Sequence, residues 1–387
     1  MSPQQQTQKP YDGFEIGPIR PPNEAGSLLL RVTRNCPWNK CTFCGLYKGQ
    51  RFSIRPVEHV LKDIETIHSY VTQIQDMIQR TGQTHSVIPD LYARLNEQDK
   101  MACYSALTWV RGGTKSVFLQ DANSLLMKPD DLVTILRHLR SYFPEIERIT
   151  SYARSHTIAR ISDSDMARLA EAGLNRIHIG MESGSDQVLD FIKKGVDKET
   201  HILAGQKVKR AGIELSEYFM PGLGGEMFSR DNAIETADAM NQIDPDFIRI
   251  RTLAIPDKTD LFQDVKAGRF RQIGDVKVAE ELLLFLEHLN GLTGTLKSDH
   301  ILNLFQEVEG DLPDEKEDMM AVIRRFLNMT PEEQMIYMVG RRTGKLTRLD
   351  DMDHPGRRCY AEQICLEFHI TPENVEETVG EMMKQFI

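Results

Sequence analysis

Three cysteines lie close together near the start of the chain, at Cys36, Cys41 and Cys44. Their C-x4-C-x2-C spacing places three thiolates on one short loop, and thiolates suit iron–sulfur clusters and zinc ions. A structural zinc ion, or a cluster held wholly by protein, needs four ligands. The loop therefore predicts either a distant fourth ligand or a metal position left open for chemistry. We favour the open position, because the next cysteine along the chain is Cys103.

Two other metal sites share parts of this pattern. A zinc site would need a fourth Cys or His beside the loop, and none is close in sequence. Plant-type [2Fe-2S] ferredoxins have the same spacing, but they add a fourth cysteine within a β-rich fold. The three remaining cysteines, Cys103, Cys359 and Cys365, make a poor ligand set, so we interpret them as free structural cysteines.

Length, charge and composition restrict the class of protein. The chain has 387 residues and a net charge of -10, which favours one large domain plus an appendage and disfavours a large nucleic-acid surface. No apolar run reaches the length of about 18 residues that a transmembrane helix needs. The N-terminus lacks the basic and apolar segments of a signal peptide, and the crowded cysteines do not resemble a disulfide framework. We therefore expect a cytoplasmic protein with no membrane contact.

Strand-like segments alternate with helical ones through the first two thirds of the chain. The predicted strands are 28–33, 116–120, 148–152, 176–180, 213–219 and 247–251. The predicted helices begin near Val57, cover 129–142 and 198–211, and lie around Met166, Val188 and Ala237. Such alternation predicts a parallel sheet in an α/β fold. Six units in series favour a partial (βα)6 TIM-like barrel, and the absence of GxGxxG after the first strand weakens a Rossmann alternative.

The pattern changes at both ends of this region. Residues 1–26 are rich in Gln, Pro and Gly and predict an extended lead-in, and 27–255 would form the barrel. A polar insertion at 79–113 has helical patches at 91–95 and 102–107. Residues 256–387 predict an all-helical C-terminal subdomain. Its expected apolar helix faces lie at 278–289, 301–308, 319–327 and 335–339.

Polar and glycine residues follow the predicted strands at the positions where an α/β barrel carries its site. They are Asp121-Ala122-Asn123-Ser124, Ser151-Tyr152-Ala153, Glu182-Ser183-Gly184-Ser185 and Pro221-Gly222-Leu223-Gly224-Gly225-Glu226. Any one of these loops alone is better explained as an ordinary βα turn. Together with the cysteine loop, they predict a ligand pocket at one end of the barrel.

These motifs resemble the radical S-adenosylmethionine (SAM) superfamily over about residues 27–255. The resemblance rests on the cysteine loop, the strand-end motifs, Lys193-Lys194-Gly195 and Gly222-Leu223-Gly224-Gly225. It is closest to the branch with elongator-type, methylthiotransferase and oxygen-independent coproporphyrinogen oxidase enzymes. The commonest family spacing is C-x3-C-x2-C, so this chain has one more residue between Cys36 and Cys41.

The resemblance implies a [4Fe-4S] cluster held by Cys36, Cys41 and Cys44, whose fourth iron binds the methionyl amino and carboxylate groups of SAM. Reductive cleavage of SAM would then give a 5′-deoxyadenosyl radical that abstracts hydrogen from a substrate. The resemblance also implies the SAM contacts. The adenine would lie near Phe43, and its wall would be shaped by Gly222, Gly224 and Gly225. The methionyl amino group would be held by Asp121, Asn123 and Ser124, and the methionyl carboxylate would pair with Lys194. The ribose would be approached by Ser151, Glu182 and Tyr218.

The sequence does not identify the substrate. The extra domains of elongator, methylthiotransferase and cobalamin-dependent enzymes are missing from this sequence, which disfavours those roles. A small molecule or a peptide is favoured over RNA, and an external donor such as flavodoxin or ferredoxin would supply the electron. The alternative is a non-catalytic iron–sulfur or zinc scaffold or sensor. Arg249 and Arg251 either face an anionic group or pair with acidic residues, and His300 could reach a substrate or simply pack.

Overall fold

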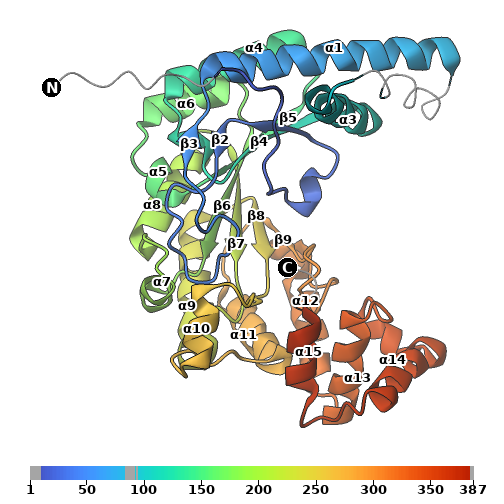
Figure 1. Ribbon diagram of the computed structural model, residues 1–387. Helices are drawn as coiled ribbons and strands as arrows, with labels where there is room; N and C mark the ends of the chain where they lie inside the picture. The colour runs from blue at the N-terminus through green and yellow to red at the C-terminus, as the bar shows by residue number, and fades with distance from the viewer. Residues whose placement is uncertain (1–9, 83–91, 93–94, 384–387) are drawn as a thin grey trace. The chain divides into compact units, whose positions relative to one another are not determined.

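The computed structural model describes residues 10–82, 92 and 95–383, which belong to two compact units. The first unit comprises the described residues of Met1–Pro37, Gly49–His178 and Ala211–Ile213. The second comprises those of Trp38–Lys48, Ile179–Arg210 and Glu214–Ile387. Strands and helices alternate in both units (Figure 1). The expected boundaries after residues 26 and 255 stay predictions.

Three parallel strands form the sheet of the first unit. Strand β4 (Ser116–Gln120) lies between β1 (Leu28–Arg31) and β5 (Arg148–Ala153). The antiparallel pair β2 (Thr33–Arg34) and β3 (Ser53–Ile54) brackets the cysteine loop in sequence. The helices and 3-10 turns are η1 (Pro22–Glu24), α1 (Val57–Thr81), α3 (Glu97–Arg111), η2 (Ser124–Leu126), α4 (Pro129–Tyr142), α5 (Ser155–Ile158) and α6 (Asp163–Glu171).

Sequence explains how these elements form. Helix α1 buries an apolar face repeating every three or four residues, made of Val60, Ile64, Ile67, Val71 and Ile74. Helix α4 has a proline in its first turn, where the missing N–H costs nothing. The Ser162 side chain caps α6 by accepting a hydrogen bond from the Asp165 N–H.

The second unit contains a parallel group of strands followed by many helices. Strand β8 (Phe247–Ile250) lies between β7 (Glu214–Phe219) and β9 (Thr295–Lys297), and β10 (Gly310–Asp311) pairs antiparallel with β9. Strand β6 (Arg176–Glu182) contains the boundary between the units, after His178. The helices and the 3-10 turn are α7 (Asp186–Phe191), α8 (Lys198–Arg210), α9 (Gly225–Ile243), α10 (Asp260–Lys266), α11 (Asp275–His288), α12 (Leu312–Leu327), α13 (Pro331–Arg342), η3 (Leu349–Asp353), α14 (Pro355–Glu367) and α15 (Val375–Met383).

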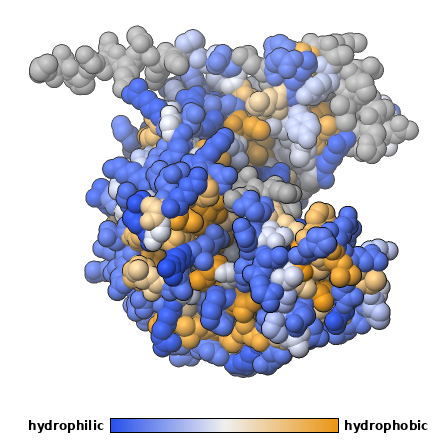
Figure 2. All heavy atoms as spheres, turned by 60° about the horizontal axis from the view of Figure 1, so that its bottom comes forward, coloured by the Kyte–Doolittle hydropathy of each residue, from blue (hydrophilic) through white to orange (hydrophobic). Residues whose placement is uncertain are grey.

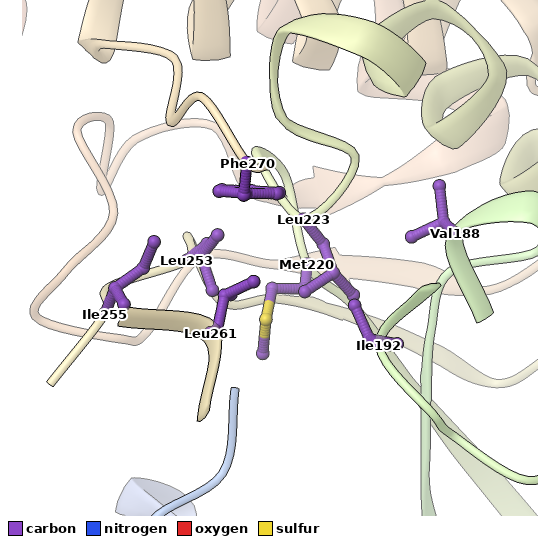
Figure 3. Close-up of a cluster of buried hydrophobic side chains, with 8 residues drawn as sticks. All are labelled: Val188, Ile192, Met220, Leu223, Leu253, Ile255, Leu261 and Phe270. Carbon is purple, nitrogen blue, oxygen red and sulfur yellow. The ribbon is translucent and has the colours of Figure 1, made fainter. Parts of the chain in front are cut away.

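A buried hydrophobic cluster stiffens the segments that follow the strands of the second unit. Its members are Val188, Ile192, Met220, Leu223, Leu253, Ile255, Leu261 and Phe270 (Figure 3). Burying each such side chain contributes about 1.5–3 kcal/mol. Phe43 of the cysteine loop packs against the same cluster. The loops expected to hold SAM in this unit are therefore packed against a buried hydrophobic cluster.

The α/β fold class expected from the sequence is confirmed, with two differences in detail. Residues 301–308 do not form the predicted helix, although Leu302, Leu304, Phe305 and Val308 are buried. Side-chain hydrogen bonds hold this segment instead, including Ser298 Oγ to the Phe305 carbonyl at 2.5 Å. The region after residue 256 also contains β9 and β10, so it is not all-helical. Three-residue and two-residue strands are too short to show a period in sequence.

Figure 2 shows one face on which hydrophobic side chains occur in patches between hydrophilic ones. Over the described residues, no helix combines the length and apolarity needed to cross a membrane. The predicted helical patch at 91–95 lies largely outside the described residues, whereas 102–107 lie within α3, as expected.

Candidate active site

The cysteine loop is shared between the two units. Cys36 belongs to the first unit, whereas Cys41 and Cys44 belong to the second. All three are partly buried, and among the described residues no cysteine forms a disulfide bond. Within each unit, as far as it is described, no three His, Cys, Asp or Glu side chains are grouped to hold a metal ion. The predicted donor set, three partly buried thiols without disulfides, fits a cluster with one open iron.

Hydrogen bonds fix the second half of the cysteine loop to the segment after α7. The Thr42 N–H donates to the Ile192 carbonyl at 2.9 Å, and the Thr42 carbonyl accepts from the Leu261 N–H at 2.9 Å. The Trp38 indole N–H donates to the Lys193 carbonyl at 2.7 Å. Because Ile192 and Lys193 directly precede Lys194, the loop that carries Cys41 and Cys44 is held against the segment that carries Lys194.

The structure brings Glu182 and Lys194 together, a pairing that the sequence did not predict. The Lys194 Nζ atom lies 3.2 Å from Glu182 Oε1, and both side chains are largely buried. The same Nζ atom lies 5.8 Å from the centre of the Phe43 ring. Glu182, the last residue of β6, has a left-handed backbone with φ of 68°. A lysine, a carboxylate and an aromatic ring thus meet beside the cysteine loop.

Glu217 on β7 is a buried acid that sequence reasoning missed. Neither of its carboxylate oxygens has a hydrogen-bond partner within the described part of the chain. Burial raises the pKa of Glu217 well above its ordinary value, while the charge of Lys194 opposes this shift and that of Glu182 adds to it. Burial therefore disfavours a second negative charge beside the Lys194–Glu182 pair. The neighbouring Tyr218 is half-buried and stands in register with Arg249.

The glycine loop after β7 adopts conformations that suit glycine. Gly222 and Gly225 have φ of 87° and 56°, and a Cβ on Gly225 would lie 2.7 Å from the Phe270 ring. Glu281 of α11 is a second residue that sequence reasoning missed. Its Oε1 atom accepts hydrogen bonds from the Gly222 N–H at 2.9 Å and from Asn232 at 2.7 Å. The predicted adenine wall is thus held by a buried carboxylate from a distant helix.

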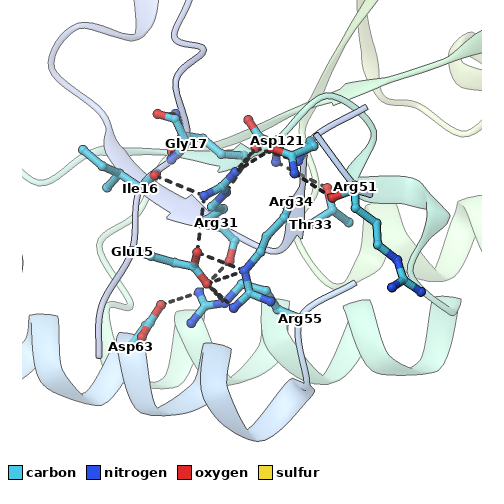
Figure 4. A network of polar contacts seen from close by, with 12 residues as sticks. Glu15, Ile16, Gly17, Arg31, Thr33, Arg34, Arg51, Arg55, Asp63 and Asp121 are labelled. Carbon is cyan, nitrogen blue, oxygen red and sulfur yellow. Dashed lines mark hydrogen bonds and ion pairs between the residues drawn. The ribbon is translucent and has the colours of Figure 1, made fainter. Parts of the chain in front are cut away.

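Asp121 of the first unit lies in a polar network with the start of the cysteine loop (Figure 4). Its Oδ2 atom accepts hydrogen bonds from Arg31 Nη2 at 2.6 Å and from the Asn35 N–H at 3.1 Å. Arg31 also contacts Glu15, which pairs with Arg34 and Arg55. Asp121 therefore positions the residue before Cys36, and its contact with the methionyl amino group stays a prediction.

The other predicted contacts of the first unit are buried and hydrogen-bonded. Asn123 donates to Thr157 Oγ1 at 2.8 Å and accepts from the Arg154 N–H at 3.2 Å, which joins the segments after β4 and β5. Ser124 donates to the Leu119 carbonyl at 3.1 Å. Ser151 donates to the Tyr152 carbonyl at 3.0 Å. These side chains shape the strand ends, and their contacts with SAM stay predictions.

The family is settled by comparison with known proteins. The model of the radical SAM superfamily matches residues 30–237, more than half of the chain. The chain belongs to the radical SAM superfamily. It is an enzyme of this class, and the [4Fe-4S] cluster and SAM expected from its sequence are the cofactors of the family. Its parallel strands and helices are the elements of the superfamily fold.

Similarity to individual proteins is more limited. The chain is 26% identical over 235 residues to 4′-phospho-dehydrooxetanocin synthase of Priestia megaterium, which covers 57% of this chain and 26% of that protein. It is 22% identical over 261 residues to tRNA uridine(34) acetyltransferase of Methanocaldococcus infernus, covering 65% and 47% respectively. Among solved structures, Elp3 of Methanocaldococcus infernus gives a TM-score of 0.41 at 14% identity, covering 55% of this chain and 53% of that one. The chain thus spans about a quarter to a half of these curated relatives.

Proposed function

We propose that this enzyme cleaves SAM reductively and uses the resulting 5′-deoxyadenosyl radical to abstract hydrogen from a substrate. Cys36, Cys41 and Cys44 would hold the [4Fe-4S] cluster, which when bound would supply the electron for reductive cleavage of SAM to methionine and the radical. The Lys194–Glu182 pair beside the cysteine loop carries this proposal. Lys194 supplies a cation for the methionyl carboxylate, and Glu182 supplies an acceptor for the ribose hydroxyls.

The remaining residues orient the nucleoside and keep water out. Phe43 packs on the adenine side, and Gly222 to Gly225 bring backbone close to the ring because they carry no side chains. Ser151 and Tyr218 complete the ribose surroundings, and Asp121, Asn123 and Ser124 face the amino group. The hydrophobic cluster packs against Phe43 and includes Leu223, so it would limit the access of water to the loops of the second unit and strengthen their polar contacts.

The proposed substrate is a small molecule or a peptide. Two relatives carry names that refer to a phosphorylated small molecule and to tRNA. The net charge of -10 favours the small molecule, because RNA binding rests on an excess of Lys and Arg. A flavodoxin-like or ferredoxin-like donor supplies the electron, and the cytoplasm is the proposed location.

Cysteine substitution tests the proposal. The full chain, reconstituted without oxygen with iron and sulfide, is expected to be brown and to hold about four irons. After reduction with SAM it should release 5′-deoxyadenosine and methionine, and Cys41→Ala should abolish both the cluster and the cleavage. Cys359→Ala, which changes an exposed cysteine remote in sequence from the loop, is the matched control. Cleavage by Cys41→Ala would overturn the proposal. A cluster whose spectrum ignores SAM, or stoichiometric zinc, would instead favour a scaffold or sensor.

A further inference from the structure

Basic side chains gather at the carboxyl ends of β8 and β9, outside the residues assigned to SAM. Arg249 is buried and already engaged, because its Nη1 atom lies 2.5 Å from Asp299 Oδ2 and its Nε atom donates to Ser216 Oγ at 3.2 Å. Of the two alternatives left open for Arg249 and Arg251 by the sequence, pairing with an acidic residue therefore holds for Arg249. Since Asp299 and Arg249 neutralise each other, the charge at this end of the strands depends on Arg251.

Arg251 is exposed and, within the described residues, makes no ion pair. Its backbone N–H donates to the Phe219 carbonyl at 3.0 Å, so it continues the parallel register of β7 and β8. Side chains alternate along a strand, and Arg251 therefore points to the same side as Arg249 and its register partner Tyr218. Because Arg251 directly follows β8 and is exposed, its guanidinium group can reach a ligand at the end of the strand.

His300 presents a second donor beside Arg251. Its Nδ1 atom accepts a hydrogen bond from the Leu302 N–H at 3.2 Å, so the neutral ring carries its proton on Nε2. Burial and, to a smaller extent, the charge of Arg251 lower the pKa of His300 to about 4, against the opposing charge of Asp299. The ring is therefore neutral at physiological pH and donates through Nε2 without adding charge.

Asn303 locks the two segments together. Its buried amide donates to the Ile250 carbonyl at 2.8 Å and accepts from the Thr252 N–H at 3.0 Å. Its own backbone N–H donates to the His300 carbonyl at 3.0 Å. Arg251 lies between the two residues that Asn303 holds, so this one side chain fixes the spacing of Arg251 and His300 before any ligand arrives.

We propose that Arg251 and His300 bind an oxyanion of the substrate, either the phosphate or the carboxylate of a small molecule. The inference rests on the proposed function, since it names the substrate class of the same enzyme. A guanidinium presents paired N–H donors that match two oxygens of a phosphate or carboxylate. The His300 Nε2–H adds a third donor. Asp299, the carboxylate next to His300 in sequence, is paired with Arg249 and therefore competes less for these donors.

Anion binding to the reconstituted full chain tests the proposal. Inorganic phosphate and acetate are titrated with SAM present, and the apparent Kd is taken from the rise in Tm at constant ionic strength set with sodium chloride. Arg251→Gln should weaken binding of the better anion about 10-fold to 100-fold, as expected for a hydrogen bond to a charged group. His300→Gln should weaken it less. Arg271→Gln, which changes an exposed arginine of the same unit, should leave it unchanged.

Each outcome decides between sources of the oxyanion. Stronger binding of phosphate assigns a phosphorylated substrate, and stronger binding of acetate assigns a carboxylate. Equal binding by wild type and Arg251→Gln, or no effect beyond that of chloride, overturns the proposal. Binding of a single-stranded RNA oligonucleotide through Arg251, without binding of either small anion, would overturn the small-molecule class.

The assay separates this inference from the proposed function, because binding needs no turnover. A wild-type chain that binds phosphate through Arg251 but makes no 5′-deoxyadenosine refutes the proposed function and leaves the anion site standing. A chain that cleaves SAM but ignores both anions refutes the anion site alone.

Discussion

The Glu281 carboxylate accepts a hydrogen bond from the Gly222 backbone N–H at 2.9 Å, across 59 positions of sequence. The same carboxylate also contacts Asn232 and Ser229, so three groups of the β7–α9 region converge on one side chain of α11. An irregular glycine-rich loop has little regular hydrogen bonding of its own. Glu281 therefore fixes the loop that is proposed to face adenine.

Glu281 should make stability depend on pH. Burial raises its pKa to about 7 from an ordinary 4.5, despite opposing hydrogen bonds from Ser229, Gly222 and Asn232. A raised pKa means that the folded state prefers the protonated form, so stability is highest at low pH and is lost as pH rises through 7. This one group should cost about 2 kcal/mol between pH 5.5 and 8.5. Glu281→Gln, which keeps the shape, should remove that slope from urea unfolding.

The neighbouring Glu280 provides the control for Glu281. It is exposed on the same helix and pairs with Lys277 at 2.7 Å, so Glu280→Gln should leave the pH dependence of the free energy of unfolding as in wild type. An identical slope for Glu281→Gln and wild type would show that Glu281 does not titrate in this range.

Gly195 should tolerate substitution poorly because it packs against Trp38 of the cysteine loop. It has φ of 71°, and a Cβ there would lie 2.2 Å from the Trp38 ring, whose indole donates to Lys193. Gly195→Ala should therefore lower the free energy of unfolding for two reasons. Displacing Trp38 should cost about 1–3 kcal/mol, and an alanine with a left-handed backbone should cost about 1 kcal/mol more. Urea unfolding and SAM cleavage measure the two consequences, and both should worsen.

Gly212 gives a matched comparison for Gly195. It has the same φ of 71°, but a Cβ there would meet nothing within 4 Å. Gly212→Ala should thus show only the backbone cost and keep full SAM cleavage. If the two variants lost equal stability, Trp38 would not anchor the loop through this contact.

The sequence predicted regular elements wherever the local signals agree. It placed Glu182 and Lys194 in the candidate site, but it did not predict that their side chains contact each other. The helix from Pro129 to Tyr142 and the strand from Ser116 to Gln120 have the predicted bounds, because proline, apolar periodicity and burial all agree there.

The missed residues depend on contacts far apart in sequence. Nothing beside Glu281 marks it as the partner of Gly222, since it lies on an amphipathic helix where an acid usually faces solvent. Glu217 is likewise a charged residue within a strand, and only the tertiary structure buries it, in succession with Leu215 and Ser216. The apolar spacing at 301–308 suggested a helix, but the side chains of Ser298 and Asn303 bind backbone carbonyls and stabilise an irregular segment.

Lys194 should contribute to SAM affinity through the methionyl carboxylate. Lys194→Gln removes the charge beside Glu182 and should weaken SAM binding about 10-fold to 100-fold, the range expected for a hydrogen bond to a charged group. Affinity for 5′-methylthioadenosine, which lacks that carboxylate, should change little, and this difference excludes a purely structural role. Lys193→Gln alters the adjacent exposed lysine and should leave both affinities intact. Equal loss of affinity for the two nucleosides in Lys194→Gln would mean that Lys194 only positions Glu182, because the ribose is common to both.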